Sequence, residues 1–254
     1  MTWEAIRLQS WYATAQGSVA ARVVGEALEP WLSTRKVEAT LGIGFTQPYL
    51  GRLGHSSKRL LGCAPAEMGV APWPPAGANR IALIRPNALP FPDESFDRVV
   101  VTHLLEGTES PRHALREIWR ILQPGGRLIL MVSNRGGYWA RRDASPLGWG
   151  RPFSPNQVKE HLQETLFIPK QYKFALFFPP VFGDSFLGSA NAWEKAGQRW
   201  FAPLGGVVLC EAEKVVYAGT PLTVESNRKR RLSPLADPAG QGRAGAHNRE
   251  AERG

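Results

Sequence analysis

Short apolar runs of strand character alternate with helical patterns along most of this chain of 254 residues. The run "FDRVVVTHLL" is nearly all apolar after its first residues, which is typical of a parallel strand covered on both faces. Alternation of this kind predicts βαβ units with right-handed crossovers. We therefore expect an α/β fold in which helices cover both faces of a doubly wound, seven-stranded sheet. The expected strands are residues 37–42, 59–63, 80–84, 96–102, 127–133, 173–178 and 207–217.

The segment "SPRHALREIWRILQPGG" is the clearest helical pattern in the chain. Ser110 is positioned to cap this helix, and Pro111 suits its first turn. The dipeptide at 124–125 then predicts a tight turn into the next strand. A second helix, at about 185–199, is expected between the last two strands. The inward stripe of the first helix is expected to be Leu115, Ile118, Trp119 and Leu122.

The chain is expected to have three parts. Residues 1–34 are predicted to form a helical segment packed on the domain, because their apolar residues fall at helical spacing. Residues 35–225 are the expected domain, and residues 226–254 a disordered, basic tail rich in Gly, Pro, Ala and Arg. Seven basic and three acidic residues in 227–254 contribute +4 of the net charge of +9. Much of the basic character therefore belongs to the tail.

Cysteine content and hydropathy limit the cellular setting. No window reaches the roughly 18 uninterrupted apolar residues of a membrane-spanning helix, so no membrane span is expected. Cys63 and Cys210 lie far apart, and neither has metal-ligand spacing around it. A reducing cytoplasm fits this pattern, whereas a disulfide scaffold or a metal site does not.

The stretch "LGIGFTQPYL" follows the first expected strand, at the edge where doubly wound sheets bind their ligands. Gly42 and Gly44 allow backbone conformations that other residues resist, and they let a ligand approach main-chain N–H groups. The alternative is a tight turn without a ligand. The G-x-G pair alone leaves both interpretations open.

Two linked stretches, "ALPFPDESFDRVVVTHLLEG" and "LREIWRILQPGGRLIL", resemble the class I S-adenosylmethionine-dependent methyltransferases, in particular the small-molecule type 11 branch. That family carries Leu-Pro-Phe-x-x-x-x-Phe-Asp into its fourth strand and Leu-x-Pro-Gly-Gly before its fifth. The resemblance covers about residues 35–135. It implies a Rossmann-like methyltransferase sheet and S-adenosylmethionine as cofactor. The matching residues are Leu89, Pro90, Phe91, Ser95, Phe96, Asp97, Leu122, Pro124, Gly125 and Gly126.

The resemblance also implies the cofactor contacts. It brings the loop after the first strand to the methionine portion, the end of the second strand to the ribose, and the loop after the third strand to the adenine. The residues at these places are Gly42, Gly44 and Phe45, then Cys63 and Ala64, then Asn87, Ala88 and Leu89.

Three acidic residues of the family pattern are replaced in this chain. Thr40, Cys63 and Arg85 stand where the family has acids that contact the cofactor. Hydrogen bonds to charged groups contribute about 1.5–3 kcal/mol each, so losing two weakens binding more than about a hundredfold. Glu67 or Asn87 is in a position to compensate, Glu67 only if its loop folds back.

The loop after the fifth strand, residues 133–154, mixes arginines and aromatic residues on a Gly-rich backbone. A long loop of this composition is commonly a substrate-binding element or lid. Its alternative role is a surface loop that tryptophans anchor to the core. His103 ends the fourth strand and is a candidate general base, or else a hydrogen-bonded loop residue. The candidate substrate-binding residues are Asn134, Arg135, Tyr138 and Trp139.

These patterns favour an S-adenosylmethionine-dependent methyltransferase that acts on a small molecule. One alternative is a catalytically inactive binding or scaffold protein on the same fold, for which the missing acids are the evidence. Another is an RNA-binding or RNA-modifying protein that uses the basic tail. A nucleic-acid partner is less favoured, because the basic residues concentrate in that tail.

Overall fold

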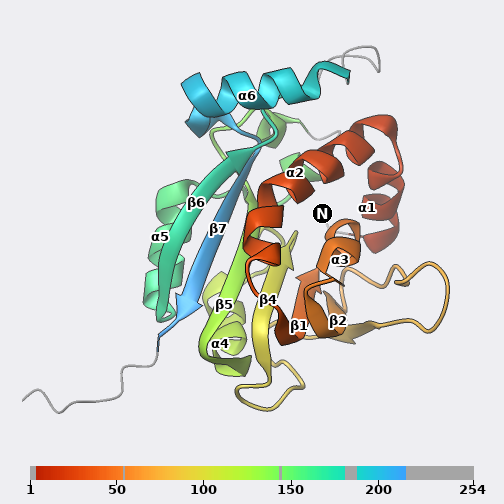
Figure 1. Cartoon of the computed structure of the whole chain (residues 1–254), viewed down its shortest axis with the longest axis vertical. Helices are drawn as coiled ribbons and strands as arrows, with labels where there is room; N and C mark the ends of the chain where they lie inside the picture. Colours follow the sequence, from red (N-terminus) through yellow and green to blue (C-terminus); the bar gives the residue numbers. More distant parts are fainter. Residues whose placement is uncertain (1–3, 54, 143–144, 181–187, 216–254) are drawn as a thin grey trace, which may run out of the picture. The chain divides into compact units, whose positions relative to one another are not determined.

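Seven strands form one sheet within the part of the chain that the computed structural model describes, residues 4–53, 55–142, 145–180 and 188–215 (Figure 1). Their order across the sheet is β3-β2-β1-β4-β5-β7-β6. Only β7 runs antiparallel to its neighbours β5 and β6. The strands are β1 (Val37–Gly44), β2 (Ser57–Pro65), β3 (Ile81–Ile84), β4 (Phe96–Thr102), β5 (Leu122–Ser133), β6 (Phe167–Ala175) and β7 (Val207–Lys214).

The strand order reverses direction at β1, which pairs in parallel with β2 on one side and β4 on the other. Gly42 lies opposite Gly62 of β2 and Val100 of β4. At such a switch point the connections leave on opposite faces, and a crevice forms beyond the carboxyl ends of the strands. The fold thus directs attention to the loops that follow β1, β2, β3 and β4.

Helices cover both faces of the sheet. On one face α2 (Ala15–Ser33) packs with α1 (Ala5–Tyr12) and α3 (Gln47–Leu53) over an apolar cluster that includes Leu28 and Ile129. On the other face α4 (Pro111–Ile121) and α5 (Pro155–Glu164) cover a second cluster, which includes Val101 and Ile118. A further helix, α6 (Ala190–Trp200), lies beside β6 (Figure 1). The described residues, up to residue 215, belong to one compact unit.

The expected strands are present, with shifted ends. The largest shift is in β6, expected at 173–178 and found at Phe167–Ala175. This edge strand has three consecutive exposed residues at its centre, between half-buried ones, and contains Pro169, so its apolar signal is weak. The expected helix at 185–199 is found at Ala190–Trp200, and residues 185–187 lie outside the described residues, as do 216–217 of the last expected strand.

Two local expectations at α4 were wrong. The Ser110 side chain does not cap the helix, because its hydroxyl oxygen lies 2.9 Å from Nδ1 of His113 instead. The inward stripe ends before Leu122, which already begins β5. Trp119 is only partly buried, and its indole N–H donates to the Leu166 carbonyl.

The N-terminal segment is helical but divided. The first helix ends at Tyr12, and Thr14 caps the second, where its hydroxyl oxygen accepts from the Gly17 amide at 3.0 Å. No helix among the described residues is long and apolar enough to cross a membrane. The basic tail expected at 226–254 lies outside the described residues.

Candidate functional site

A cavity of about 310 Å³ opens at the carboxyl ends of β2, β3 and β4, next to the switch point of the sheet. The end of β2 contributes Pro65 and Glu67, and the loop after β3 contributes Asn87. The end of β4 supplies His103, and the turn beyond it supplies Gly107. A carboxylate, an amide and an imidazole therefore come from three separate strands to one crevice.

Glu67 reaches this cavity because the chain turns back after β2. The Met68 amide donates to the Pro65 carbonyl at 2.9 Å, and the Ala66 amide donates to Ile84 of β3. The turn leaves the Glu67 side chain exposed at the cavity wall. An acidic side chain thus stands near the end of β2, although the strand itself ends without one.

Gly44 is required by the packing of β1 against β4. Its φ is +91°, a left-handed conformation that favours glycine, and a Cβ there would strike the Thr102 carbonyl. The neighbouring Phe45 amide donates to the Thr102 carbonyl at 3.0 Å, and the Thr102 hydroxyl donates to the Phe45 carbonyl at 2.7 Å. A Cβ at Gly42 would strike the side chains of Thr46 and Leu50. Both glycines therefore have packing reasons to be glycine.

Phe45, Cys63 and Ala64 are buried at the ends of β1 and β2 and do not line the cavity. The Phe45 ring stacks on Tyr12 of α1, with centroids 5.6 Å apart. Burial raises the pKa of the Cys63 thiol to about 11, so this thiol stays protonated at neutral pH. Only main-chain atoms at these positions are suited to contact a ligand.

The three residues expected at the adenine lie in different surroundings in the loop after β3. Asn87 lines the cavity, whereas Ala88 is exposed and bridges to Arg85. Leu89 is buried, and its amide donates to Glu117 Oε2 at 2.8 Å. The Leu89 carbonyl accepts from the Arg120 guanidinium at 2.9 Å. The Leu-Pro-Phe run therefore fastens the loop to α4, and its first residue faces the core.

His103 lies at the inner wall of the cavity and is fully buried. Its Nε2 lies 2.7 Å from the phenol oxygen of Tyr12, which is itself 3.2 Å from the phenol oxygen of Tyr49. Burial lowers the pKa of His103 to about 3. The imidazole is therefore neutral at physiological pH, and it accepts a proton less readily than an exposed histidine does.

Glu106 links the ends of β4 and β5. Its Oε1 accepts from the Ser133 amide at 2.7 Å, and its carbonyl accepts from the Arg151 amide at 2.9 Å. The side chain is buried, and burial raises the pKa of its carboxyl. Glu106 thus fastens the loop after β5 to the floor of the site.

The positions of the missing acids have structural partners of their own. The Thr40 hydroxyl lies 2.6 Å from the Ser57 hydroxyl, which joins β1 to β2. Glu38, two residues earlier, forms an exposed ion pair with Lys58. Neither residue lines the strand-end cavity.

The residues expected to bind substrate do not line the strand-end cavity either. Asn134 is buried, and its side-chain amide donates to the carbonyls of Pro203 and Gly205. The Arg135 guanidinium donates to the Pro152 carbonyl. Trp139 is fully buried, and its indole N–H donates to the Phe178 carbonyl at 2.9 Å. Tyr138, which is 55% exposed, lies at a different cavity beside α6.

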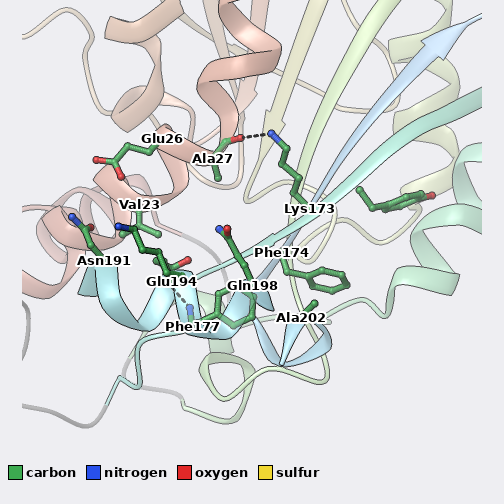
Figure 2. A pocket seen from close by; sticks show the side chains of 12 residues that line it. Val23, Glu26, Ala27, Lys173, Phe174, Phe177, Asn191, Glu194, Gln198 and Ala202 are labelled. Atoms are coloured by element: carbon green, nitrogen blue, oxygen red, sulfur yellow. Dashed lines mark hydrogen bonds between the residues drawn. The ribbon is translucent and has the colours of Figure 1, made fainter. Parts of the chain in front are cut away.

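A cavity of about 620 Å³ with charged and apolar walls lies between α2, β6 and α6 (Figure 2). Several of its charged groups already have partners. Lys173 donates to the Ala27 carbonyl, and Glu194 accepts from the Phe177 amide (Figure 2). These two contacts serve the packing of α2 and α6 on the strand β6 and its end. Glu26 pairs with Arg22 within α2. No cluster of His, Cys, Asp and Glu that could hold a metal ion occurs in the described ranges.

Comparison with known proteins agrees with this geometry. A family model described as "Methyltransferase domain" matches residues 37–130, from the first residue of β1 into β5. Among solved structures, a SAM-dependent methyltransferase from Thermotoga maritima superposes with a TM-score of 0.54 at 21% identity, over 81% of this chain and 94% of that chain. One from Archaeoglobus fulgidus reaches a TM-score of 0.56 at 13% identity, over 82% and 98%.

The curated relatives match only a short segment. The demethylmenaquinone methyltransferase of Clavibacter sepedonicus is 40% identical over 57 residues, which is 22% of this chain and 23% of that protein. The ubiquinone/menaquinone biosynthesis C-methyltransferase of Pseudoalteromonas translucida is 48% identical over 44 residues, 17% and 18% of the two chains. The matches thus span less than a quarter of these relatives' length.

The strand order with its antiparallel β7, and the cavity at the switch point, define a class I S-adenosylmethionine-dependent methyltransferase fold. Residues 37–130 match the methyltransferase domain family, and the described part of the chain has the fold of the class I methyltransferases. The cofactor that this family implies is S-adenosylmethionine.

Proposed function

We propose that this protein transfers a methyl group from S-adenosylmethionine to a small-molecule acceptor. The observation that carries the proposal is the strand-end cavity, in which Glu67, Asn87 and His103 meet beside the β1 loop of a methyltransferase domain. In a doubly wound sheet this edge is where ligands bind. The polar groups at the cavity match the hydroxyls and amines of a nucleoside.

Glu67 takes the role of the acid that the end of β2 lacks. Its exposed carboxylate at the cavity wall is suited to accept hydrogen bonds from the two ribose hydroxyls. The Asn87 amide offers both a donor and an acceptor to the adenine edge. Main-chain atoms of Gly42, Gly44 and Phe45 face the methionine portion in this proposal. The remaining proposed contacts are main-chain atoms of Cys63, Ala64, Ala88 and Leu89.

The protein's contribution to the reaction is alignment and exclusion of water. When bound, the cofactor supplies a methyl group on a sulfonium, which passes to an acceptor lone pair as the sulfur leaves as a thioether. Because burial holds the pKa of His103 at about 3, its neutral ring places no positive charge beside a sulfonium. We propose that His103 orients the acceptor by hydrogen bonding, a role that requires its contact with Tyr12 to open.

The acceptor is proposed only as a small molecule. The two relatives are a demethylmenaquinone methyltransferase and a methyltransferase of ubiquinone/menaquinone biosynthesis, but their matches span a short part of the chain. Asn134, Arg135, Tyr138 and Trp139 were expected to bind the acceptor. Asn134 and Trp139 are buried and bonded to main-chain carbonyls, and Arg135 and Tyr138 do not line the strand-end cavity, so the acceptor contacts are not assigned to these four residues.

The test is calorimetric titration of the purified protein with S-adenosylmethionine and, separately, with S-adenosylhomocysteine. Micromolar binding of both supports the proposal and justifies an acceptor screen. Absence of binding at millimolar ligand contradicts it and favours an inactive protein on the same fold. Gly42→Val is unsuitable as a site variant, because its side chain would strike Thr46 and Leu50 of α3.

A further inference from the structure

An apolar cavity of about 590 Å³ lies beside α6, formed with the 3₁₀ turn Trp139–Arg141 and the segment after β6. Its apolar walls include Phe177, Pro179, Trp193 and Leu204. A volume of several hundred cubic ångströms with apolar and aromatic walls is typical of small-molecule sites. This cavity shares no lining residue with the strand-end cavity.

The cavity walls are held by defined contacts. The Glu194 carboxylate accepts from the amides of Phe177 at 2.6 Å (Figure 2) and of Leu176 at 3.1 Å, which fastens α6 to the chain at the end of β6. A Cβ at Gly197 would strike the Phe177 ring, so α6 packs closely on that side chain. The cavity is therefore a built feature of the fold.

The charged side chains described at this cavity are all basic. Arg141 and Arg142 contribute to the wall, both are exposed, and no acidic residue in the described ranges lines it. Within the described residues neither guanidinium has a salt-bridge partner. Arginine binds carboxylate and phosphate groups through paired N–H donors. The head group that fits is therefore an anion.

The aromatic side chains at the cavity are unusually exposed. Tyr138 is 55% exposed, Phe201 55% and Trp193 40%, although each is large and apolar or amphipathic. Large apolar groups gathered around a concave surface mark an interaction site more often than chance exposure. They supply the surface that an alkyl or aromatic body would cover.

We propose that this cavity binds an amphipathic anion, with its apolar body against α6 and its carboxylate or phosphate head on Arg141 and Arg142. The cavity is separate from the proposed methyl-transfer site. Between α1 and the segment after β6, Trp139 is fully buried, with its ring 6.1 Å from Trp11 and 5.2 Å from Phe178. Because the two cavities share no lining residue, the binding is measured without S-adenosylmethionine and does not depend on the proposed function.

The experiment titrates the full chain with monomeric decanoate, with 1-decanol and with acetate. We expect saturable binding of decanoate, binding at least about tenfold weaker for decanol, which lacks the charge, and none for acetate. The variant R141Q/R142Q should lose the preference for decanoate over decanol. Ala196→Phe, which fills the cavity, should abolish binding of both.

Arg151→Gln is the matched control, since Arg151 belongs to the same loop but does not line this cavity, and it should bind decanoate as the parent does. Circular dichroism is used to check that each variant is folded. Equal affinity for decanoate and decanol, or an unchanged affinity in Ala196→Phe, overturns the proposal. Co-sedimentation with phosphatidylglycerol vesicles distinguishes a lipid source, which pellets the protein, from a free anion, which does not.

Discussion

The phenol oxygen of Tyr12 lies 2.7 Å from Nε2 of His103, so the N-terminal helix α1 contacts the end of β4 directly. The same ring stacks on Phe45, the residue that follows the G-x-G turn. The first residue of the helix is also fastened to the site, because the Ala5 amide donates to the Met68 carbonyl at 2.7 Å. Helix α1 therefore covers the edge where the methyltransferase cofactor is proposed to bind.

Tyr12→Phe should destabilise the protein. The change removes the hydroxyl that bonds His103 and Tyr49 in a buried setting, and an unpaired buried polar group costs about 1–3 kcal/mol. Urea unfolding measures the loss. Tyr138→Phe is the control, since its phenol is largely exposed and surface changes stay within about 0.5 kcal/mol. Equal effects of the two variants would show that the buried contact adds no stability.

His103 should make the protein less stable in acid. Burial lowers its pKa from 6.5 to about 3, so the unfolded chain binds a proton that the folded chain does not. Its contribution is fully present above pH 6.5 and is lost as the pH falls toward 3. Between pH 7 and pH 5 the loss is about 2 kcal/mol. Urea unfolding at both pH values should therefore show a smaller drop in the free energy of unfolding for His103→Gln than for the parent protein. An equal drop in the two proteins would show that the pKa of His103 is not lowered.

Gly44→Ala should be strongly unfavourable. With φ at +91° and the Thr102 carbonyl in the way, the methyl group costs at least about 1–3 kcal/mol. Gly51→Ala provides the contrast, because Gly51 lies in α3 with open space around its Cβ position. That change should stabilise the helix by about 0.5–1 kcal/mol. Thermal unfolding of both variants checks the opposite signs, and two changes of the same sign would contradict this account.

Glu67→Gln should weaken S-adenosylmethionine binding by about tenfold, because the charge-assisted bonds to hydroxyls are lost. Glu160→Gln, on the exposed face of α5, removes the same charge away from the cavity and should leave affinity unchanged. Calorimetric titration measures both. If the two variants bind alike, Glu67 does not replace the missing acid of β2.

The fold could be predicted because its signals are local. The apolar run of β4 and the helix over Pro111–Ile121 repeat their patterns over neighbouring residues, which is the scale on which secondary structure is chosen. The glycine pair marked a real backbone requirement at Gly44. The strand β6 was predicted too far toward the C-terminus, because a half-exposed edge strand with polar residues lacks a strong apolar pattern.

The site was less predictable, because its contacts join distant parts of the chain. Glu67 and Asn87 meet at one cavity only after β2 and β3 pair in register. Trp139 was expected to bind substrate, yet its indole N–H donates to the Phe178 carbonyl in the core. Any buried tryptophan can form such a bond, so the sequence does not distinguish the two roles. Tyr12 carried no sequence signal for the site, since nothing local marks a tyrosine that will meet a histidine across the fold.

The sequence by itself determined the α/β class, the approximate strands and the resemblance of residues 35–135 to the methyltransferases, because periodicity and short motifs are written in consecutive residues. Only the tertiary structure decided that Leu89 faces the core, that Glu67 turns back to the cavity and that Tyr12 covers His103. The physical reason is that burial and hydrogen-bond partners depend on which strands and helices pack together, and such contacts arise only when distant segments meet.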